Sequence, residues 1–277
     1  MSRFLPDDLF VGVEKQRLSF VRRSRGFKQC IVATFEVALP FDFWETPDIN
    51  SIGRSLPSEI CTGVRASIVI ADRMVRYFLV DRPHGARSPE EIELTAALRF
   101  EELFGVDAEH WQIQLDLHPW ACNFLACALQ RTHMALLQEL FMSLRIPLLH
   151  ISPFGAAQWN RHGRKLRESN VCFVALSAES AWLTLRRDRR WLTANVQGFR
   201  DDRAIELRDF IRREFVRHGL LEQWNAHPIY LAGVVDHRIP IVFENARQLS
   251  ATTYLGLDQG HADSFQIALS HAWPACK

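Results

Sequence analysis

The sequence predicts an α/β protein built from two similar halves. The first observation is an alternating apolar segment, 171–185, which is typical of a strand, a tight turn and an antiparallel strand, and which continues past a basic tip into 191–196. The second is that the chain opens in the same way at 9–14 and 18–21. In both halves three predicted strands precede a helix and a further strand, so we expect a duplicated architecture with a cleft between the halves.

Composition excludes several classes of function. The 277 residues are 48% hydrophobic, enough for one or two ordinary cores, and carry a net charge of only +1. Nucleic-acid and membrane-surface binding normally need a basic excess, so we expect neither a nucleic-acid partner nor direct membrane insertion. No apolar run of membrane-spanning length occurs, the N-terminus lacks a signal-peptide core, and the scattered cysteines favour a reduced, cytosolic protein.

The first half contains four further predicted elements. Residues 29–39 form a third strand that ends at Pro40, and 50–60 form a short helix that Pro57 limits. Strands are predicted at 64–71 and 75–80.

A helix at 88–105 has the clearest local signal. Ser88 can cap it, Pro89 fits its first turn and Glu91 completes a capping box, while Gly105 ends it. We expect one apolar side to face the core: Leu94, Ala97, Leu98 and Phe104.

The remaining elements follow from periodicity. Strands at 111–117 and 121–129 form a hairpin, 132–144 is an amphipathic helix, 147–151 is a strand and 160–170 is an exposed connection. The second half continues from its three strands to a helix and further strands: 202–218, 228–235, 239–243 and the closing apolar segment 264–273. The predicted division is 1–160, with an inserted subdomain at 75–130, and 161–277, whose segment 264–277 returns to the first half.

Three groups of residues have a functional and a structural interpretation. His118, Cys122, Cys127 and His133 include ligand types, but a strand or a helix would point the two thiols apart, so we expect core residues and no metal. The basic run 186–190 is interrupted by an aspartate, which favours a solvated hairpin tip over a phosphate or lipid site. Mixed charges along 200–217 favour an exposed, ion-paired helix face.

No nucleophile elbow, P-loop or zinc-protease motif is present, and we expect no catalytic residue and no cofactor. The two hairpin openings, the late strand 229–233 and the closing segment 265–269 nevertheless resemble the actin-like ATPase superfamily, which has a duplicated RNase H-like fold. More narrowly, nearly the full length resembles the PilM family of type IV pilus assembly proteins, in its short HofM-like branch.

The resemblance implies a degenerate nucleotide site. In the superfamily both hairpin turns carry Asp-x-Gly and hold phosphates and magnesium, and a Gly-Gly pair receives the adenosine. The matching turns here are Glu14-Lys15-Gln16 and Ala175-Leu176-Ser177, and the pair is Gly233-Val234.

Each replacement has a physical consequence. A left-handed Gln16 would cost about 1–2 kcal/mol and would place a side chain where phosphate would lie. Ala175 cannot hold a metal-bound water, and Val234 would crowd an adenine. Asp7 and Asp8 could substitute for the lost aspartate, but we expect them to precede the strand and to be exposed.

The resemblance also implies a function. It is that of a cytoplasmic, non-catalytic adaptor, held at the inner membrane through a partner, which binds the N-terminal tail of a PilN-like protein. The tail would enter a groove within 75–129, for which the candidate lining residues are Phe78, Leu94, Leu98 and Phe124. Plain core packing is the alternative role of these four.

Other functions stay open. One is a scaffold like the type II secretion protein GspL, although that family continues into a transmembrane helix and this chain ends at Lys277 without one. Another is an ATPase or kinase that still binds ATP, and a third is a filament-forming relative. The sequence does not decide self-association or the identity of the machine, whether pilus, secretion or DNA uptake.

Overall fold

A computed structural model describes residues 6–25, 30–85, 88–118, 121–163, 166, 168–233 and 246–249. By internal contacts the chain divides into two units. Unit 1 takes its described residues from Met1–Met74 and Thr132–Ala157, and unit 2 from Val75–Arg131 and Gln158–Ala251. The inserted segment therefore groups with the second half, whereas the sequence analysis assigned it to the first. The returning segment 264–277 lies outside the described residues.

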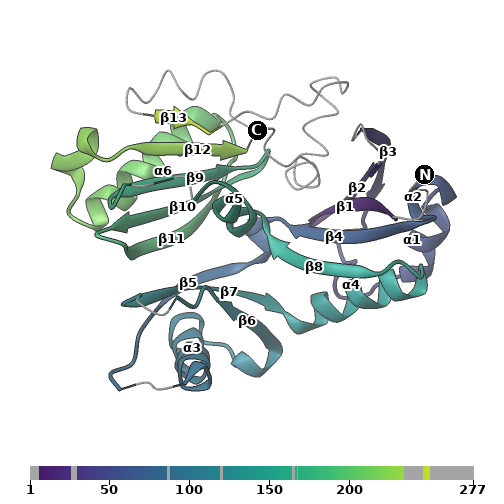
Figure 1. The fold of residues 1–277 in the computed structure, drawn as a ribbon, viewed down its shortest axis with the longest axis horizontal. Coiled ribbons are helices and arrows are strands. Elements are labelled where there is room, and N and C mark those ends of the chain that lie inside the picture. Colours follow the sequence, from purple (N-terminus) through teal and green to yellow (C-terminus); the bar gives the residue numbers. More distant parts are fainter. Residues whose placement is uncertain are drawn as a thin grey trace. The chain divides into compact units, whose positions relative to one another are not determined.

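Unit 1 is organised around a five-stranded sheet of order β3-β2-β1-β4-β8 (Figure 1). Its central strand β1 (Asp7–Glu14) pairs antiparallel with β2 (Arg17–Arg23) and parallel with β4 (Val64–Ile70). Strand β3 (Ile31–Ala38) pairs antiparallel with β2, and β8 (Leu148–Pro153) pairs parallel with β4. The first hairpin and the strands predicted after it are confirmed.

Helices and a 3-10 turn complete unit 1. They are α1 (Ile49–Ser55), α2 (Ser58–Cys61), the 3-10 turn η1 (Asp72–Met74), α4 (Arg131–Ser143) and α5 (Phe154–His162). Two of the helices, α4 and α5, extend beyond the residues assigned to this unit. Helix α5 was not predicted from the sequence. The buried carboxylate of Asp72 accepts a hydrogen bond from the Gly155 N–H at 2.8 Å, so a distant residue caps the start of this helix.

Unit 2 contains a second five-stranded sheet, of order β11-β10-β9-β12-β13. Its strands are β9 (Val171–Leu176), β10 (Ser180–Arg187), β11 (Arg190–Gly198), β12 (Ile229–Gly233) and β13 (Ala246–Gln248). Strand β9 pairs antiparallel with β10 and parallel with β12, as β1 pairs with β2 and β4. The predicted duplication is confirmed, because both sheets share one topology. The predicted strand 239–243 lies outside the described residues.

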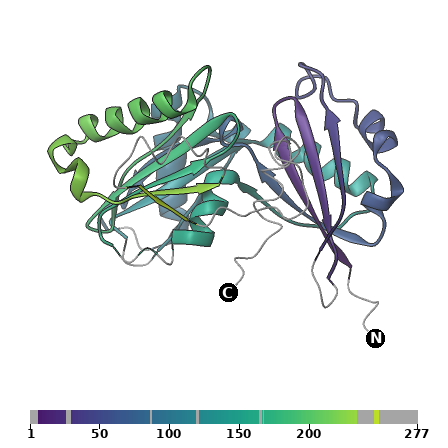
Figure 2. The same cartoon turned by 90° about the horizontal axis from the view of Figure 1, so that it is seen from above.

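Helix α6 (Arg203–Arg217) runs along one face of this sheet (Figure 2). The Asp202 carboxylate caps it by accepting hydrogen bonds from two backbone N–H groups, and the 3-10 segment η4 (Leu221–Ala226) follows. Leu207, Phe210, Ile211 and Phe215 pack from α6 into the core over the sheet. No helix in the part of the chain that the structure describes has both the length and the apolar character needed to cross a bilayer.

The inserted segment forms a three-stranded antiparallel sheet of order β5-β7-β6, covered on one face by α3 (Figure 1). Its elements are β5 (Arg76–Asp81), α3 (Pro89–Phe104), the 3-10 turn η2 (Ala108–His110), β6 (Trp111–Leu115) and β7 (Asn123–Gln130). The Ser88 hydroxyl accepts a hydrogen bond from the Glu91 N–H at 3.4 Å, and Gly105 ends the helix at φ +64°. Both predicted ends are confirmed.

The predicted apolar side of α3 is only partly correct, because Ala97 and Phe104 pack against the core and the two leucines do not. Ile92, Ala96 and Phe100 are buried against the sheet, whereas Leu94 and Leu98 are 65% and 60% exposed. Apolar residues occur on every side of this helix, so helical spacing alone does not select the side that packs. The strands select it, because they place aromatic rings under Phe100.

Candidate functional site

The first turn of the predicted degenerate nucleotide site joins β1 to β2 in unit 1. Glu14, which retains a carboxylate at this turn, is a buried residue with 8% of its surface exposed. Its carboxylate forms an ion pair with the guanidinium of Arg17 in the same hairpin. Glu14 and Arg17 also pair across the two strands. The Arg17 guanidinium therefore already pairs with the carboxylate that a bound magnesium ion would need as a ligand.

The backbone of this turn corrects one expectation. The non-glycine residues at positive φ in the described chain are Arg145, Asp188 and Arg189, so Gln16 is not left-handed and the predicted strain does not arise. The turn carbonyls are fixed from outside instead: Lys15 O accepts from Trp44 Nε1 at 2.8 Å, and Gln16 O accepts from the Leu39 N–H at 2.8 Å. Gln16 itself is exposed.

The second turn joins β9 to β10 in unit 2. Ala175 lies within β9, fully buried, and is paired with Trp182 on one side and Ala232 on the other. The turn begins at Ser177, whose hydroxyl lies 3.0 Å from the Ser180 hydroxyl and accepts a hydrogen bond from the Ser180 N–H at 3.1 Å. The side chain that replaces glycine here is thus used to close the turn.

Sequence reasoning missed an arginine at this turn. The Arg203 Nη2 donates to the Ser177 carbonyl at 2.8 Å, and its guanidinium lies 5.5 Å from the centre of the Phe199 ring. From the charge pattern, Arg203 was expected on an exposed, ion-paired helix face. Asp202 is a recognisable N-cap, so the sequence could have placed Arg203 in the first turn of α6. In the structure that end of the helix lies beside the β9–β10 turn.

The third position is Gly233, which ends β12 at φ +86° beside Leu176. Glycine is favoured at such a φ because it has no Cβ. Val234 lies outside the described residues.

The described residues do not fit a magnesium triphosphate. Arg17 neutralises Glu14, Ala175 offers no ligand atom, and Ser177 hydrogen-bonds within its own turn. We derive no phosphoryl-transfer step from these two turns.

Asp7 and Asp8, the proposed substitutes for the lost aspartate, are neither outside β1 nor fully exposed. Asp8 is 7% exposed, and its carboxylate forms ion pairs with Arg23 at 2.9 Å, Arg25 at 3.0 Å and Arg65 at 3.1 Å. The reason is that β1 lies between β2 and β4, which bring arginines to it from both sides. A carboxylate shared by three guanidinium groups is a poor ligand for a metal ion.

The four candidate groove residues do not line one surface. Phe78 and Phe124 are 4% and 0% exposed and belong to the core between α3 and its sheet, where the Phe78 ring lies 5.6 Å from Phe100. Leu94 and Leu98 lie on the exposed side of α3. Phe78 and Phe124 therefore support the fold and do not line an open groove.

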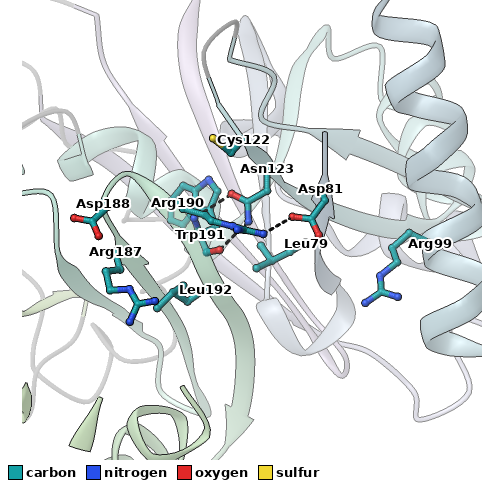
Figure 3. A pocket seen from close by; sticks show the side chains of 10 residues that line it. All are labelled: Leu79, Asp81, Arg99, Cys122, Asn123, Arg187, Asp188, Arg190, Trp191 and Leu192. Carbon is teal, nitrogen blue, oxygen red and sulfur yellow. Dashed lines mark hydrogen bonds and ion pairs between the residues drawn. The ribbon is translucent and has the colours of Figure 1, made fainter. Parts of the chain in front are cut away.

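A hollow of about 470 Å³ lies within unit 2, where β5 and β7 meet β11 (Figure 3). Arg190 Nη2 lies 2.9 Å from the Asp81 carboxylate at its edge. The adjoining hairpin tip is exposed, as predicted, and turns through Asp188 at φ 51° and Arg189 at φ 64°. Two left-handed residues are typical of the type I′ turn that suits a two-residue hairpin.

Solved structures with the same arrangement of elements identify the fold. One is a protein with an actin-like ATPase fold and unknown function from Bacteroides thetaiotaomicron, with a TM-score of 0.57, 11% identity, and 90% of this chain and 94% of that chain covered. This chain has an actin-like fold. The predicted resemblance is thereby confirmed at the level of the fold.

Two further structures share the actin-like fold over almost the whole chain. A chain of the PilM–PilN type IV pilus biogenesis complex has a TM-score of 0.59 at 16% identity, with 96% of this chain and 97% of that chain covered. The cytoplasmic domain of EpsL, an inner-membrane component of the type II secretion system of Vibrio cholerae, has a TM-score of 0.57 at 12% identity, with 97% of each covered. No protein-family model matches the sequence, and the comparison with curated proteins finds no match.

Proposed function

We propose that this protein is a non-catalytic adaptor of a type IV pilus assembly machine. In this role it binds the cytoplasmic N-terminal tail of a PilN-like inner-membrane protein, and so connects the assembly motor to the membrane complex. It would lie in the cytoplasm and reach the membrane only through that partner. The likeness to a chain of the PilM–PilN complex over 96% of this chain supports the proposal.

The ion pair between Arg17 and Glu14 carries the non-catalytic part of the proposal. Nucleotide hydrolysis on this fold would need carboxylates that hold a magnesium ion and backbone N–H groups that reach the phosphates. In the first turn a guanidinium already neutralises the carboxylate, and in the second the Ser177 hydroxyl and the Ser180 N–H bond one another. The actin-like fold would then function by binding other proteins at its surface and not by hydrolysing nucleotide.

Two alternatives have an observation in their favour. A GspL-like secretion scaffold is supported by the equally complete likeness to the EpsL cytoplasmic domain. Residual binding of an anionic nucleotide is supported by Arg203, which brings a positive charge to the second turn. Both differ from the adaptor proposal in what the protein binds.

Calorimetric titration of the full chain separates these functions. One arm uses magnesium ATP, and the other uses a synthetic N-terminal tail of a PilN-like inner-membrane protein from the same organism, with a scrambled tail as the control. We expect no heat from ATP and a dissociation constant on the order of 1 μM for the tail, equivalent to about −8 kcal/mol. ATP binding accompanied by hydrolysis would overturn the proposal, and so would equal binding of the scrambled tail.

A further inference from the structure

An open groove of about 360 Å³ lies in the inserted segment, between one side of α3 and β6. The lining residues that determine its charge and its space are Glu93, Ala97, Glu101, Glu109, Ile113 and Arg131. All of them belong to unit 2, and none belongs to either hairpin turn.

Among the described strands, none pairs with the β6 side of the groove, which is a free sheet edge. Strand β6 is an outer strand of the order β5-β7-β6, and its register pairs Gln114 with Cys127. The Asp116 N–H donates to the Leu125 carbonyl at 2.9 Å, so by antiparallel alternation Gln114 also bonds toward β7. The backbone N–H and C=O groups of Ile113 and Leu115 therefore point away from β7, toward the edge. An unpaired edge of this kind is a template for another strand.

The α3 side of the groove is small and acidic. Glu93, Ala97 and Glu101 follow one another at a spacing of four, so they form one stripe along the helix. Both glutamates are exposed, and the methyl group of Ala97 leaves room beside the half-buried Ile113. Space for a small apolar side chain is thus flanked by carboxylates.

The side chain of Arg131 also lines the groove and is held by two hydrogen bonds. Its guanidinium donates to the Glu109 carbonyl at 2.8 Å and to Gln112 Oε1 at 3.0 Å. Among the described residues that line the groove, Arg131 is the only basic one, against the three carboxylates of Glu93, Glu101 and Glu109, so this lining is acidic overall.

We propose that this groove binds an extended, basic segment of a partner protein, which adds to β6 as a fourth strand. Main-chain hydrogen bonds to Ile113 and Leu115 supply the affinity, and alternate side chains supply the specificity. A small apolar residue of the segment lies against Ala97, and lysines or arginines on either side meet Glu93, Glu101 and Glu109. The inference rests on the proposed adaptor role for the class of occupant and adds its location and its chemistry.

A second copy of this chain fits the same edge less well. Pairing β6 with β6 about a two-fold axis would bring two acidic stripes together, and like charges at an interface disfavour it. The charge of the groove therefore favours a basic partner over self-association.

The experiment selects binders for the full chain from a phage-displayed library of random peptides about eight residues long, the length of an ordinary strand or slightly more. We expect the selected peptides to alternate Lys or Arg with small apolar residues. A selection without basic enrichment would overturn the inference, and so would concentration-dependent dimerisation that the peptides do not displace.

Two exposed charge reversals test the groove directly. In the double variant Glu93→Lys and Glu109→Lys, we expect the selected peptide to bind at least about tenfold more weakly, because attraction becomes repulsion. The matched control, Glu102→Lys with Glu139→Lys, changes the net charge equally at exposed positions outside the groove and should bind as the native protein does. Equal binding by both variants would refute the site.

A proline tests strand addition separately from charge. In Ile113→Pro the lost N–H faces the free edge, so the β6–β7 pairing survives while peptide binding is lost. The comparison variant Gln114→Pro removes a bond to β7 and should lower the melting temperature of the protein. Hydrogen exchange should show new protection at Ile113 and Leu115 with peptide bound. If the partner tail still binds both the charge-reversal and Ile113→Pro variants normally, the groove inference fails and the adaptor proposal stands.

Discussion

The side-chain amide of Asn123 completes two hydrogen bonds with the backbone of Trp191. Its Nδ2 donates to the Trp191 carbonyl at 2.8 Å, and its Oδ1 accepts from the Trp191 N–H at 3.1 Å (Figure 3). Asn123 begins β7 and Trp191 lies in β11, so one buried side chain joins the inserted sheet to the large sheet within unit 2. Strand β11 also contacts β5 and β7, so the inserted segment groups with the second half of the chain.

Replacing Asn123 by alanine should therefore destabilise unit 2. The change leaves a buried N–H and a buried C=O of Trp191 without these partners, so we expect the free energy of unfolding to fall by about 2–4 kcal/mol. Urea denaturation followed by tryptophan fluorescence measures it. The control is Asn170→Ala, which removes an exposed hydrogen bond to the Asp188 N–H and should cost about 1 kcal/mol or less. Equal losses in the two variants would contradict the assigned role of Asn123.

Restoring the missing aspartate of the second turn should fail. Ala175 is fully buried between two strands, so Ala175→Asp places an unpaired carboxylate in the core and should cost about 3 kcal/mol or more. Magnesium ATP should not recover the lost stability in a thermal melt. The control Ala178→Asp lies in the turn at a half-buried position and should be milder. An Ala175→Asp protein of native stability that magnesium ATP stabilises further would support the nucleotide-binding alternative.

Glu214 is a buried structural residue, although its Oε1 also pairs with Arg217 Nη1 at 3.0 Å. It is 3% exposed, and its Oε2 accepts from Thr193 Oγ1 at 3.0 Å and from Asn195 Nδ2 at 2.9 Å. Glu214→Ala removes an acceptor from the buried Thr193 hydroxyl and from the half-buried Asn195 amide, so we expect a loss of about 2–4 kcal/mol in chemical denaturation. The control Asp209→Ala breaks a half-exposed pair on the same helix and should change stability by about 0.5 kcal/mol or less. A similar small effect at Glu214 would contradict its burial.

His133 should make unit 1 less stable in mild acid. Burial lowers the pKa of its imidazole, an effect that the charge of Glu45 partly opposes, and its ring packs 4.7 Å from that of Trp44. Because the folded protein disfavours the protonated ring, stability is fully present above the ordinary histidine pKa of about 6.5 and falls as the pH drops below it.

The measurement for His133 is the free energy of unfolding between about pH 7.5 and 5. His133→Phe keeps a ring against Trp44 and removes the titration, so its curve should fall less steeply than that of the native protein. The control His110→Asn replaces an exposed histidine and should keep the native slope. Parallel curves for native protein and His133→Phe would show that another group causes the acid sensitivity.

The sequence by itself determined the elements whose signals are local. Alternation with a period of two, followed by short polar turns, predicted the β1–β2 and β9–β10 hairpins and with them the duplication. Ser88 and Gly105 marked both ends of α3 because capping involves residues within one turn of the helix end. The same local reading found the turns that correspond to the nucleotide site, although it assigned Gln16 a strain that the backbone does not have.

Only the tertiary structure decided which side of each element packs into a core and which side chains bond to distant segments. The cap of α5 comes from Asp72, the packed side of α3 is chosen by strands that follow and precede it, and Asn123 finds its partner at Trp191. The free edge of β6 likewise exists only once β7 has paired with its other side. The physical reason is that burial and hydrogen bonding between distant segments depend on how the chain packs, whereas periodicity, capping and turn formation depend on neighbouring residues.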